Sequence, residues 1–251
     1  GRALATGSVR LAGHPSLADL PGHGSGDWWV QDAAAALAAR VLAPRAGERV
    51  LDLCAAPGGK TMQLAAAGAR VTALDLSEAR MVRLRENLAR TGLAARVVVA
   101  DALTWDPLTP DEGADPGIGD AGFDAVLLDA PCSATGTIRR HPDLPHVRDP
   151  SGLRALADLQ AALIDRALDL VRPGGRVVYC TCSLLPEEGE RQVSAALARH
   201  PGLTCDSTTA DLPGAEPSWA AKGGGLRLRP DFWADIGGID GFFIACLRRP
   251  E

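Results

Sequence analysis

Short apolar runs alternate with longer amphipathic stretches along most of this chain, and this alternation constrains the fold more than any other feature. The apolar runs are nearly continuous in Val, Leu and Ala, which is typical of strands buried on both faces of a sheet. We predict six strands, at 49–53, 70–76, 96–100, 123–129, 175–181 and 241–247. Helical patterns are found at 31–42, 58–66, 77–90, 153–171 and 187–199. The alternation indicates an α/β fold with a mostly parallel sheet covered by helices on both faces.

Length and composition exclude several classes of protein. The 251 residues fit one large domain, or one domain with a small appendage. No apolar run approaches the ~20 residues that cross a bilayer, and residues 1–20 contain no secretory signal. The six cysteines include no C-x-x-C pair, so neither a zinc ribbon nor a disulfide scaffold is expected. We therefore expect a cytoplasmic protein with free thiols, without a metal site and without a membrane partner.

The net charge of −5 is concentrated in one segment. Six acidic residues and no Lys or Arg lie between Trp105 and Asp124, and residues 107–122 within that stretch are predicted to form a surface loop. Without those six acids the net charge would be +1. The overall acidity is therefore weak evidence against RNA as a partner.

The segment Val50-Leu-Asp-Leu-Cys-Ala-Ala-Pro-Gly-Gly-Lys-Thr61 reads as a strand, a turn of small residues and the start of a helix. Gly58 and Gly59 allow backbone amides to approach a ligand at the carboxyl end of the first strand. A dinucleotide would require G-x-G-x-x-G, which is absent. The P-loop of an NTPase ends in Gly-Lys-Thr, as here, but its first Gly falls on Cys54, and 126–129 resembles its metal-binding strand. That alternative stays open.

A third ligand, S-adenosylmethionine, accounts for acidic residues that follow three strands. Asp75, 23 residues after Asp52, can accept both ribose hydroxyls of a nucleoside. Asp101 follows the third strand and can meet the adenine amino group, and Asp129 ends the fourth. Each of them could instead cap a helix or turn. Three such residues at one edge of a sheet favour a nucleoside site.

Two cysteines also follow strands, in Asp129-Ala-Pro-Cys132-Ser133 and in Tyr179-Cys-Thr-Cys182-Ser183. In a parallel sheet both would lie beside the cofactor crevice, where a thiol can act as a nucleophile. The other four cysteines are interpreted as small buried hydrophobic residues. Cys180 and Cys182 have no His or Cys partner at the spacing of a metal site.

These motifs resemble the signatures of the Sun/nucleolar-protein family of RNA cytosine-5 methyltransferases, from about Trp28 to Ala245, and within it most closely the bacterial RsmB (Fmu) type. The resemblance implies a Rossmann-like seven-stranded methyltransferase fold and a substrate in small-subunit (16S) ribosomal RNA, which is methylated to 5-methylcytosine. It also implies that Cys182 is the nucleophile and that Cys132 assists product release. S-adenosylmethionine would be held by Cys54, Ala55, Ala56, Pro57, Gly58, Gly59 and Lys60, together with Asp75, Asp101 and Asp129.

The chemistry of cytosine explains why a nucleophilic thiol is needed. A thiolate that adds to carbon 6 of cytosine makes carbon 5 reactive towards a methyl sulfonium. A proton or hydrogen bond at ring nitrogen 3, which Asp129 could supply, stabilises the adduct. Arg139 and Arg140, which follow the Pro-Cys turn, are predicted to contact RNA phosphates, with His141 beside them.

The expected organisation is an N-terminal extension, 1–26, left from a truncated RNA-binding region, followed by a catalytic domain, 27–251, acting as a monomer. Three other functions stay open: a tRNA cytosine-5 methyltransferase, a P-loop-like NTPase and a non-catalytic RNA-binding scaffold. Only the methyltransferases need both thiols and all three acids.

Overall fold

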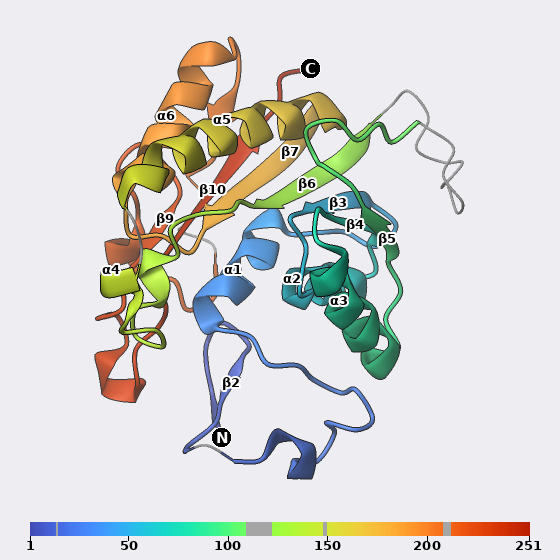
Figure 1. The fold of residues 1–251 in the computed structure, drawn as a ribbon, viewed down its shortest axis with the longest axis vertical. Coiled ribbons are helices and arrows are strands. Elements are labelled where there is room, and N and C mark those ends of the chain that lie inside the picture. The colour runs from blue at the N-terminus through green and yellow to red at the C-terminus, as the bar shows by residue number, and fades with distance from the viewer. Residues whose placement is uncertain (14, 109–121, 148–149, 208–211) are drawn as a thin grey trace.

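The structure is a computed structural model that describes residues 1–13, 15–108, 122–147, 150–207 and 212–251. Most of the predicted loop at 107–122 and Arg148 lie outside these residues. The centre of the molecule is an eight-stranded sheet in which seven strands follow the order β5-β4-β3-β6-β7-β10-β8 and β9 pairs with β10 (Figure 1). The strands are β3 (Arg49–Leu53), β4 (Arg70–Asp75), β5 (Arg96–Val99), β6 (Phe123–Asp129), β7 (Val171–Thr181), β8 (Thr204–Cys205), β9 (Leu226–Leu228) and β10 (Phe242–Arg248).

All six predicted strands are present, and the α/β prediction is confirmed. Strands β5, β4, β3, β6 and β7 are parallel, whereas β10 runs antiparallel to β7, β8 and β9. The sequence does not predict β8 and β9, since two or three residues are too short to show a pattern.

The start of β7 differs from the prediction, because the strand begins at Val171 rather than at residue 175. Phe123 of β6 pairs with Val171, but Ala125 already pairs with Arg176. The Pro173-Gly174-Gly175 segment is therefore accommodated as an irregularity inside the strand, with Gly174 at φ +68°. Proline cannot donate to the ladder, which explains why the pairing skips this segment.

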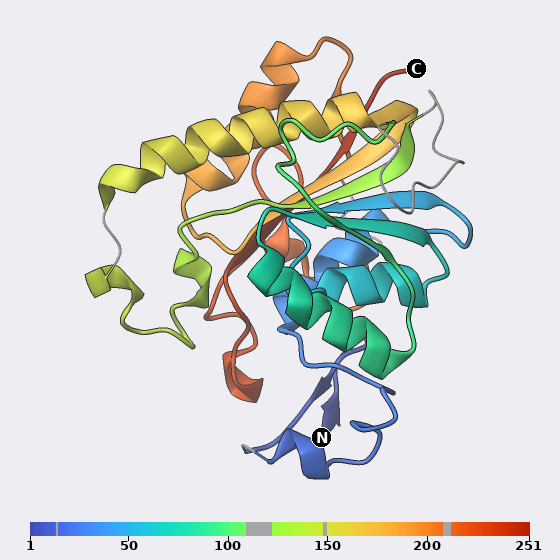
Figure 2. The same cartoon turned by 45° about the vertical axis from the view of Figure 1, so that its right-hand side comes forward.

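Helices cover both faces of the sheet. Helices α1 (Ala33–Leu42), α2 (Gly59–Ala66) and α3 (Glu78–Thr91) pack on one face, and α5 (Leu153–Leu170) and α6 (Glu190–Arg199) lie on the other (Figure 2). The short helix α4 (Leu144–Val147) lies outside these layers. The predicted cap at Ser77 is confirmed, since its side chain accepts a hydrogen bond from the backbone of Arg80. Helix α6 begins three residues later than predicted, because Pro186–Glu188 form a separate 3-10 turn.

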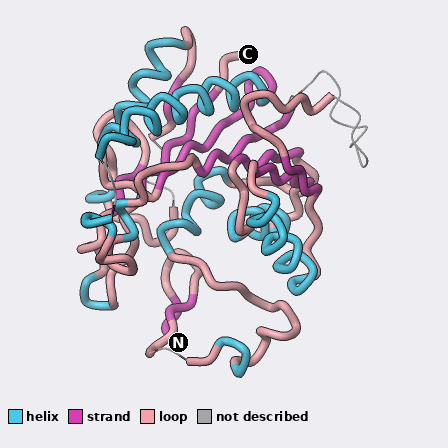
Figure 3. Tube along the Cα trace, viewed as in Figure 1, coloured by secondary structure: helices cyan, strands magenta, loops and turns pink. Residues whose placement is uncertain are grey.

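Within 1–26, the described residues form the short strands β1 (Arg2–Ala3) and β2 (Val9–Arg10) and one 3-10 turn, and they extend below α1 (Figure 3). Arginine hydrogen bonds attach them to the rest of the chain. Arg10 Nη1 donates to the carbonyl of Ile236 at 2.5 Å, and Arg90 Nη1 donates to that of His23 at 3.0 Å. Leu4 is buried in the core beside α1.

The direction in which the chain moves across the sheet reverses between β3 and β6. From β3 the chain passes outward through β4 to β5, and from β6 it passes to β7 in the opposite direction. In open α/β sheets, ligands bind outside the carboxyl ends of the strands where the order reverses in this way. The turns that follow β3, β4, β6 and β7 are therefore where a functional site is expected.

Candidate functional site

The turn after β3 requires backbone conformations that favour glycine. Gly58 adopts φ +104° just before α2 begins at Gly59. A Cβ atom at Gly58 would lie 2.9 Å from Leu84 Cγ, so a side chain there would be strained and crowded. Helix α2 therefore begins directly after this turn, and its first N–H groups, which have no partner within the helix, lie at the carboxyl end of β3.

Lys60 lies next to the end of β6. Its Nζ is 2.6 Å from Asp129 Oδ2, and Cys180 Sγ lies 3.6 Å from Asp129 Oδ1. Burial by itself lowers the pKa of Lys60, but the Asp129 carboxylate outweighs burial and raises that pKa above its usual value. Lys60 is therefore a buried cation whose charge is balanced by a partly exposed carboxylate.

Thr61 provides a test of the P-loop alternative. A P-loop threonine presents its hydroxyl to a magnesium ion. Here Thr61 is fully buried and its hydroxyl donates to Asp52 Oδ2 at 2.6 Å. The Gly-Lys-Thr triplet thus lacks the exposed hydroxyl that an NTPase requires, and the structure opposes that interpretation.

Asp52 is fully buried beneath the turn. Its Oδ2 accepts the Thr61 hydroxyl, and its Oδ1 has no hydrogen-bond partner among the described residues. Burial raises the pKa of this carboxyl to about 7. A carboxylate is costly to bury without partners, which explains the direction of the shift.

This raised pKa predicts a pH-dependent stability. Between the unfolded pKa of about 3.9 and the folded pKa, the folded state binds the extra proton, so stability falls as the pH rises and levels off above that range. From pH 5 to pH 8 the loss assigned to Asp52 is about 3 kcal/mol. The Asp52→Asn variant should not show this loss. Between pH 5 and pH 8, urea unfolding should therefore show its free energy of unfolding rising by about 3 kcal/mol relative to that of the wild type. Parallel stability curves of the two proteins would contradict the prediction.

Asp75 and Asp101 occupy the predicted strand ends but differ in burial. Asp75 is buried, and its carboxylate accepts the backbone N–H of Ala56 at 3.1 Å and of Ser77 at 2.9 Å. Asp101 is exposed, and its Oδ1 accepts the backbone N–H of Leu103 at 3.0 Å. Both therefore hold turns, which is the alternative role considered for them. Asp75 Oδ2 also lies 3.5 Å from Arg80 Nη1, whereas Oδ1 can accept a second hydrogen bond, so a ligand role is compatible with these contacts.

The two cysteines that follow β6 and β7 are in contact. Cys132 Sγ and Cys182 Sγ are 3.5 Å apart, and both side chains are half-buried. The hydrogen bond from Cys132 lowers the pKa of Cys182, whereas the same bond, together with burial, raises the pKa of Cys132 well above its usual value. Cys182 is therefore the more acidic thiol of the pair and Cys132 the less acidic one. By contrast, burial raises the pKa of Cys54 to about 12, so this thiol is not activated.

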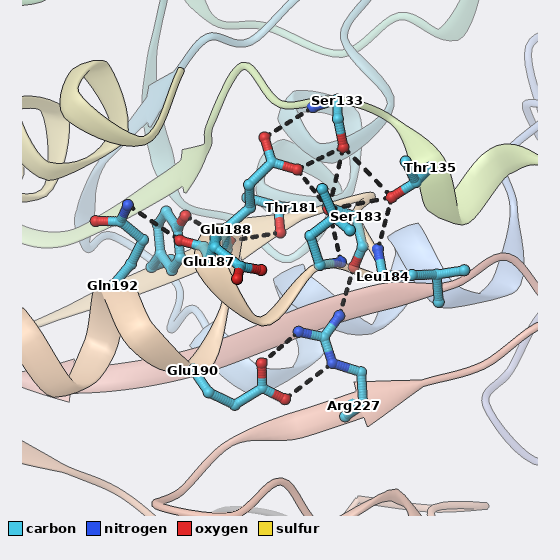
Figure 4. Close-up of polar contacts among 12 residues, drawn as sticks. Ser133, Thr135, Thr181, Ser183, Leu184, Glu187, Glu188, Glu190, Gln192 and Arg227 are labelled. Carbon is cyan, nitrogen blue, oxygen red and sulfur yellow. Dashed lines mark hydrogen bonds and ion pairs between the residues drawn. The ribbon is translucent and has the colours of Figure 1, made fainter. Parts of the chain in front are cut away.

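Sequence reasoning missed a buried carboxylate behind the two thiols. Glu188 is fully buried and its oxygens bind Ser133 and Ser183, which follow Cys132 and Cys182 (Figure 4). The only signal was the Glu187-Glu188 pair after Pro186. A helix beginning at residue 187, as predicted, gives no reason to bury one of these glutamates and expose the other.

The side chains of Arg139 and Arg140, which are predicted to contact RNA phosphates, already form ion pairs with carboxylates in the structure. Arg139 Nη2 lies 3.0 Å from both Asp32 Oδ2 and Asp240 Oδ1, and Arg140 Nη2 lies 2.7 Å from Asp240 Oδ2. Asp240 is buried, so its charge is balanced by these guanidinium groups. The pairs attach the segment after the Pro-Cys turn to the start of β10 and to the cap of α1.

Within the described part of the chain, no group of three or more His, Cys, Asp or Glu residues is arranged to hold a metal ion. None of its helices is both long and apolar enough to cross a membrane.

Comparison with known proteins gives consistent results. The family model described as 16S rRNA methyltransferase RsmB/F matches residues 39–248. The chain is 44% identical over 212 residues to ribosomal RNA small subunit methyltransferase B of Klebsiella pneumoniae, which covers 83% of this chain and 47% of the relative. The chain spans about half the length of the curated relatives it matches.

Solved structures are also similar. NSun6 from Pyrococcus horikoshii, crystallised with SFG, superimposes with a TM-score of 0.77 at 30% identity, covering 95% of this chain and 57% of that one. A methyltransferase homologue from the same organism gives a TM-score of 0.71 at 30% identity, covering 93% and 72% of the two chains. The architecture is that of the Rossmann-like methyltransferases.

Proposed function

Since the chain belongs to the 16S rRNA methyltransferase RsmB/F family, we propose that it transfers a methyl group from S-adenosylmethionine to carbon 5 of a cytosine in small-subunit ribosomal RNA. The observation that carries the proposal is the contact between Cys132 and Cys182, with the pKa of Cys182 lowered. A non-catalytic scaffold would not need an activated thiol. The tRNA of the alternative reaction would demand the same chemistry, and the family favours ribosomal RNA.

The residues at the carboxyl ends of the parallel strands fit S-adenosylmethionine. The proposed binding residues are the turn from Cys54 to Lys60, Asp75 and Asp101. Asp75 keeps acceptor capacity for ribose hydroxyls, and the Gly58 turn opens the amino end of α2. When bound, the cofactor supplies an electrophilic methyl group on a positively charged sulfur. The ligand SFG in the NSun6 structure is an analogue of this cofactor.

The chain's own residues account for the steps of the reaction. The Cys182 thiolate attacks carbon 6 of cytosine, and the resulting charge is neutralised by a proton at ring nitrogen 3. Asp129 would supply that proton from its protonated form, and the Lys60 ammonium, 2.6 Å from Asp129 Oδ2, would stabilise the carboxylate left behind. After methyl transfer, carbon 5 gives up its proton to water, the ring double bond re-forms as the bond to Cys182 breaks, and the proton on nitrogen 3 returns to Asp129. The hydrogen bond from Cys132 stabilises the departing thiolate.

The reaction is proposed to take place in the cytoplasm. A free thiol pair 3.5 Å apart needs a reducing environment to stay reduced, as the cytoplasm provides. The target base has to be unpaired or flipped out of a helix, which costs a few kcal/mol. All the residues invoked come from one chain, so the chain is proposed to act as a monomer.

Transfer of labelled methyl from S-adenosylmethionine tests the proposal. We expect label as 5-methylcytosine in unmodified small-subunit ribosomal RNA, and far less in unmodified tRNA. Preferential labelling of tRNA would replace the proposed substrate by the alternative. ATP hydrolysis without methyl transfer would overturn the proposed activity.

Cofactor affinity gives a second test, through Asp75→Asn. The change keeps the size of the side chain but removes the charge that strengthens hydrogen bonds from ribose hydroxyls. Such bonds contribute about 1.5–3 kcal/mol, so the Kd for S-adenosylmethionine should rise about 10- to 100-fold. Isothermal titration calorimetry measures it. Glu78→Gln, at an exposed ion pair at the start of α3, is the control, and equal Kd values for the two variants would contradict the assignment.

A further inference from the structure

Glu188 is a fully buried carboxylate whose four hydrogen-bond donors are all neutral groups. Oε1 accepts the backbone N–H of Ser133 at 2.9 Å and the amide of Gln160 at 3.1 Å. Oε2 accepts the hydroxyls of Ser133 and Ser183, each at 2.5 Å. The carboxylate thereby satisfies the four strong acceptor positions that a buried charge needs.

Three of these four donors come from two separate active-site loops. Ser133 directly follows Cys132 in the loop after β6, and Ser183 directly follows Cys182 in the loop after β7. One carboxylate therefore ties together the two segments that carry the thiols, as the converging dashed lines in Figure 4 show.

Other contacts strengthen the junction between these loops. Gly136 donates its backbone N–H to the Cys182 carbonyl at 2.9 Å, and Leu184 donates its own to Thr135 Oγ1 at 2.9 Å. A Cβ atom at Gly136 would lie 1.9 Å from the carbonyl oxygen of Gly241, just before β10, and 2.9 Å from that of Cys182, so the loop after β6 lies too close to both segments for a side chain at this position. These backbone contacts join the two loops beside the thiols, and Glu188 joins them a second time through the neighbouring serines.

Glu188 is itself held firmly. Its backbone carbonyl accepts the Tyr179 hydroxyl at 2.8 Å and the Thr181 hydroxyl at 3.0 Å, both from β7. Gln160, which reaches the carboxylate from α5, also donates to the Pro131 carbonyl. The carboxylate is therefore anchored to the sheet and to α5, and it cannot follow either loop if that loop moves.

We propose that Glu188 is a positioning residue that holds Cys132 and Cys182 in contact by binding the serine next to each of them. The proposal rests on the proposed function, in which this thiol pair carries the reaction, and it extends that function to a residue that touches neither thiol. The buried charge also favours the required division of roles. The pKa of Cys132 is raised mainly by its hydrogen bond to Cys182 and by burial, and the negative charge of Glu188 raises it further.

Glu188→Gln is the sharpest variant, because it preserves size. A glutamine must place its NH2 group either against the Ser133 and Gln160 N–H donors, which cannot accept, or against the two serine hydroxyls. In the second case the hydroxyls must turn around, although Ser183 Oγ already accepts the backbone N–H of Leu185 at 3.0 Å. Ser183→Ala removes one arm of the same network and serves as a milder second variant should Glu188→Gln fold poorly.

Disulfide formation in the chain without RNA or cofactor reads the thiol geometry directly. Oxidised glutathione converts the two thiols to a Cys132–Cys182 disulfide and is itself reduced to two glutathione molecules, and mass spectrometry of the peptides gives the rate. We expect Glu188→Gln to slow this step at least 10-fold and Ser183→Ala to slow it less. Glu187→Gln, at an exposed ion pair with Arg191, should leave it unchanged.

The pH profile of Cys182 alkylation adds a readout that simple loss of stability would not move. If Cys132 no longer contacts Cys182, the pKa of Cys182 should rise, so the alkylation profile of folded Glu188→Gln should shift to higher pH. In active enzyme, kcat should fall about 100-fold, the scale of a 1 Å displacement, with a much smaller change in KM. Oxidation rates and alkylation profiles equal to wild type would overturn the positioning role. Absence of methyl transfer in the wild type would instead overturn the proposed function, and the thiol measurements would still decide the role of Glu188.

Discussion

Replacing Cys182 by alanine is expected to abolish methyl transfer, with kcat/KM falling by about 10⁴- to 10⁶-fold, as enzymes do when they lose a nucleophile. The reason is that carbon 5 of cytosine becomes nucleophilic only after a thiolate has added to carbon 6. In this site the thiol with the lowered pKa is Cys182. Label transfer from S-adenosylmethionine to small-subunit ribosomal RNA measures the effect.

The matched control is Cys205→Ala. Cys205 is a half-buried thiol on β8, at the far end of the sheet order from β5, so its loss should leave the rate unchanged. S-adenosylmethionine binding by Cys182→Ala should be retained, which shows that the fold is intact. If Cys182→Ala still transferred methyl while Cys132→Ala did not, the nucleophile would have to be reassigned to Cys132.

Replacing Cys132 by alanine is expected to separate bond formation from product release. Cys182 can still attack the base, but the proton donor that stabilises the departing thiolate is lost. Turnover should fall about 10²- to 10⁴-fold, the range for a lost proton-transfer group. A covalent RNA–protein adduct should accumulate during the first turnover and survive denaturing electrophoresis.

The hydrogen bond between Cys132 and Cys182 also predicts a pH effect in Cys132→Ala. Cys132 lowers the pKa of Cys182, so removing it should raise that pKa, and alkylation of Cys182 near neutral pH should become slower. The double variant Cys132→Ala/Cys182→Ala should form no adduct. Normal turnover by Cys132→Ala, or an adduct in the double variant, would contradict the assignment of the two thiols.

Sequence reasoning predicted features that depend on local pattern. The six longer strands are continuous apolar runs, and the turn after β3 has the glycines that its φ angles require, so both could be read directly. Placing Cys132 beside Cys182 followed from topology, because parallel neighbouring strands end at the same edge of the sheet.

Features that depend on pairing across the fold were not predictable. Nothing in the run at 241–247 shows that β10 is antiparallel to β7. Arg139 and Arg140 resemble phosphate-binding residues in sequence, and only the three-dimensional structure brings Asp240, one hundred residues away, against them. Glu188 and Glu187 are adjacent and chemically identical, and their different burial is decided by which of them faces Ser133 and Ser183.

The ion pairs around Asp240 change how the neighbouring arginines would respond to a polyanion. A phosphate that reaches Arg139 or Arg140 has to displace a carboxylate that is already bound, so one anion is exchanged for another. Such an exchange frees fewer counterions than the neutralisation of a phosphate by an unpaired cation. Any affinity that these two arginines add is consequently less sensitive to salt than their number suggests. Displacing Asp240 and Asp32 from the arginines would also weaken the contact between the Pro-Cys segment and the start of β10. Binding of an anion by Arg139 and Arg140 would therefore be linked to the mobility of the Pro-Cys segment.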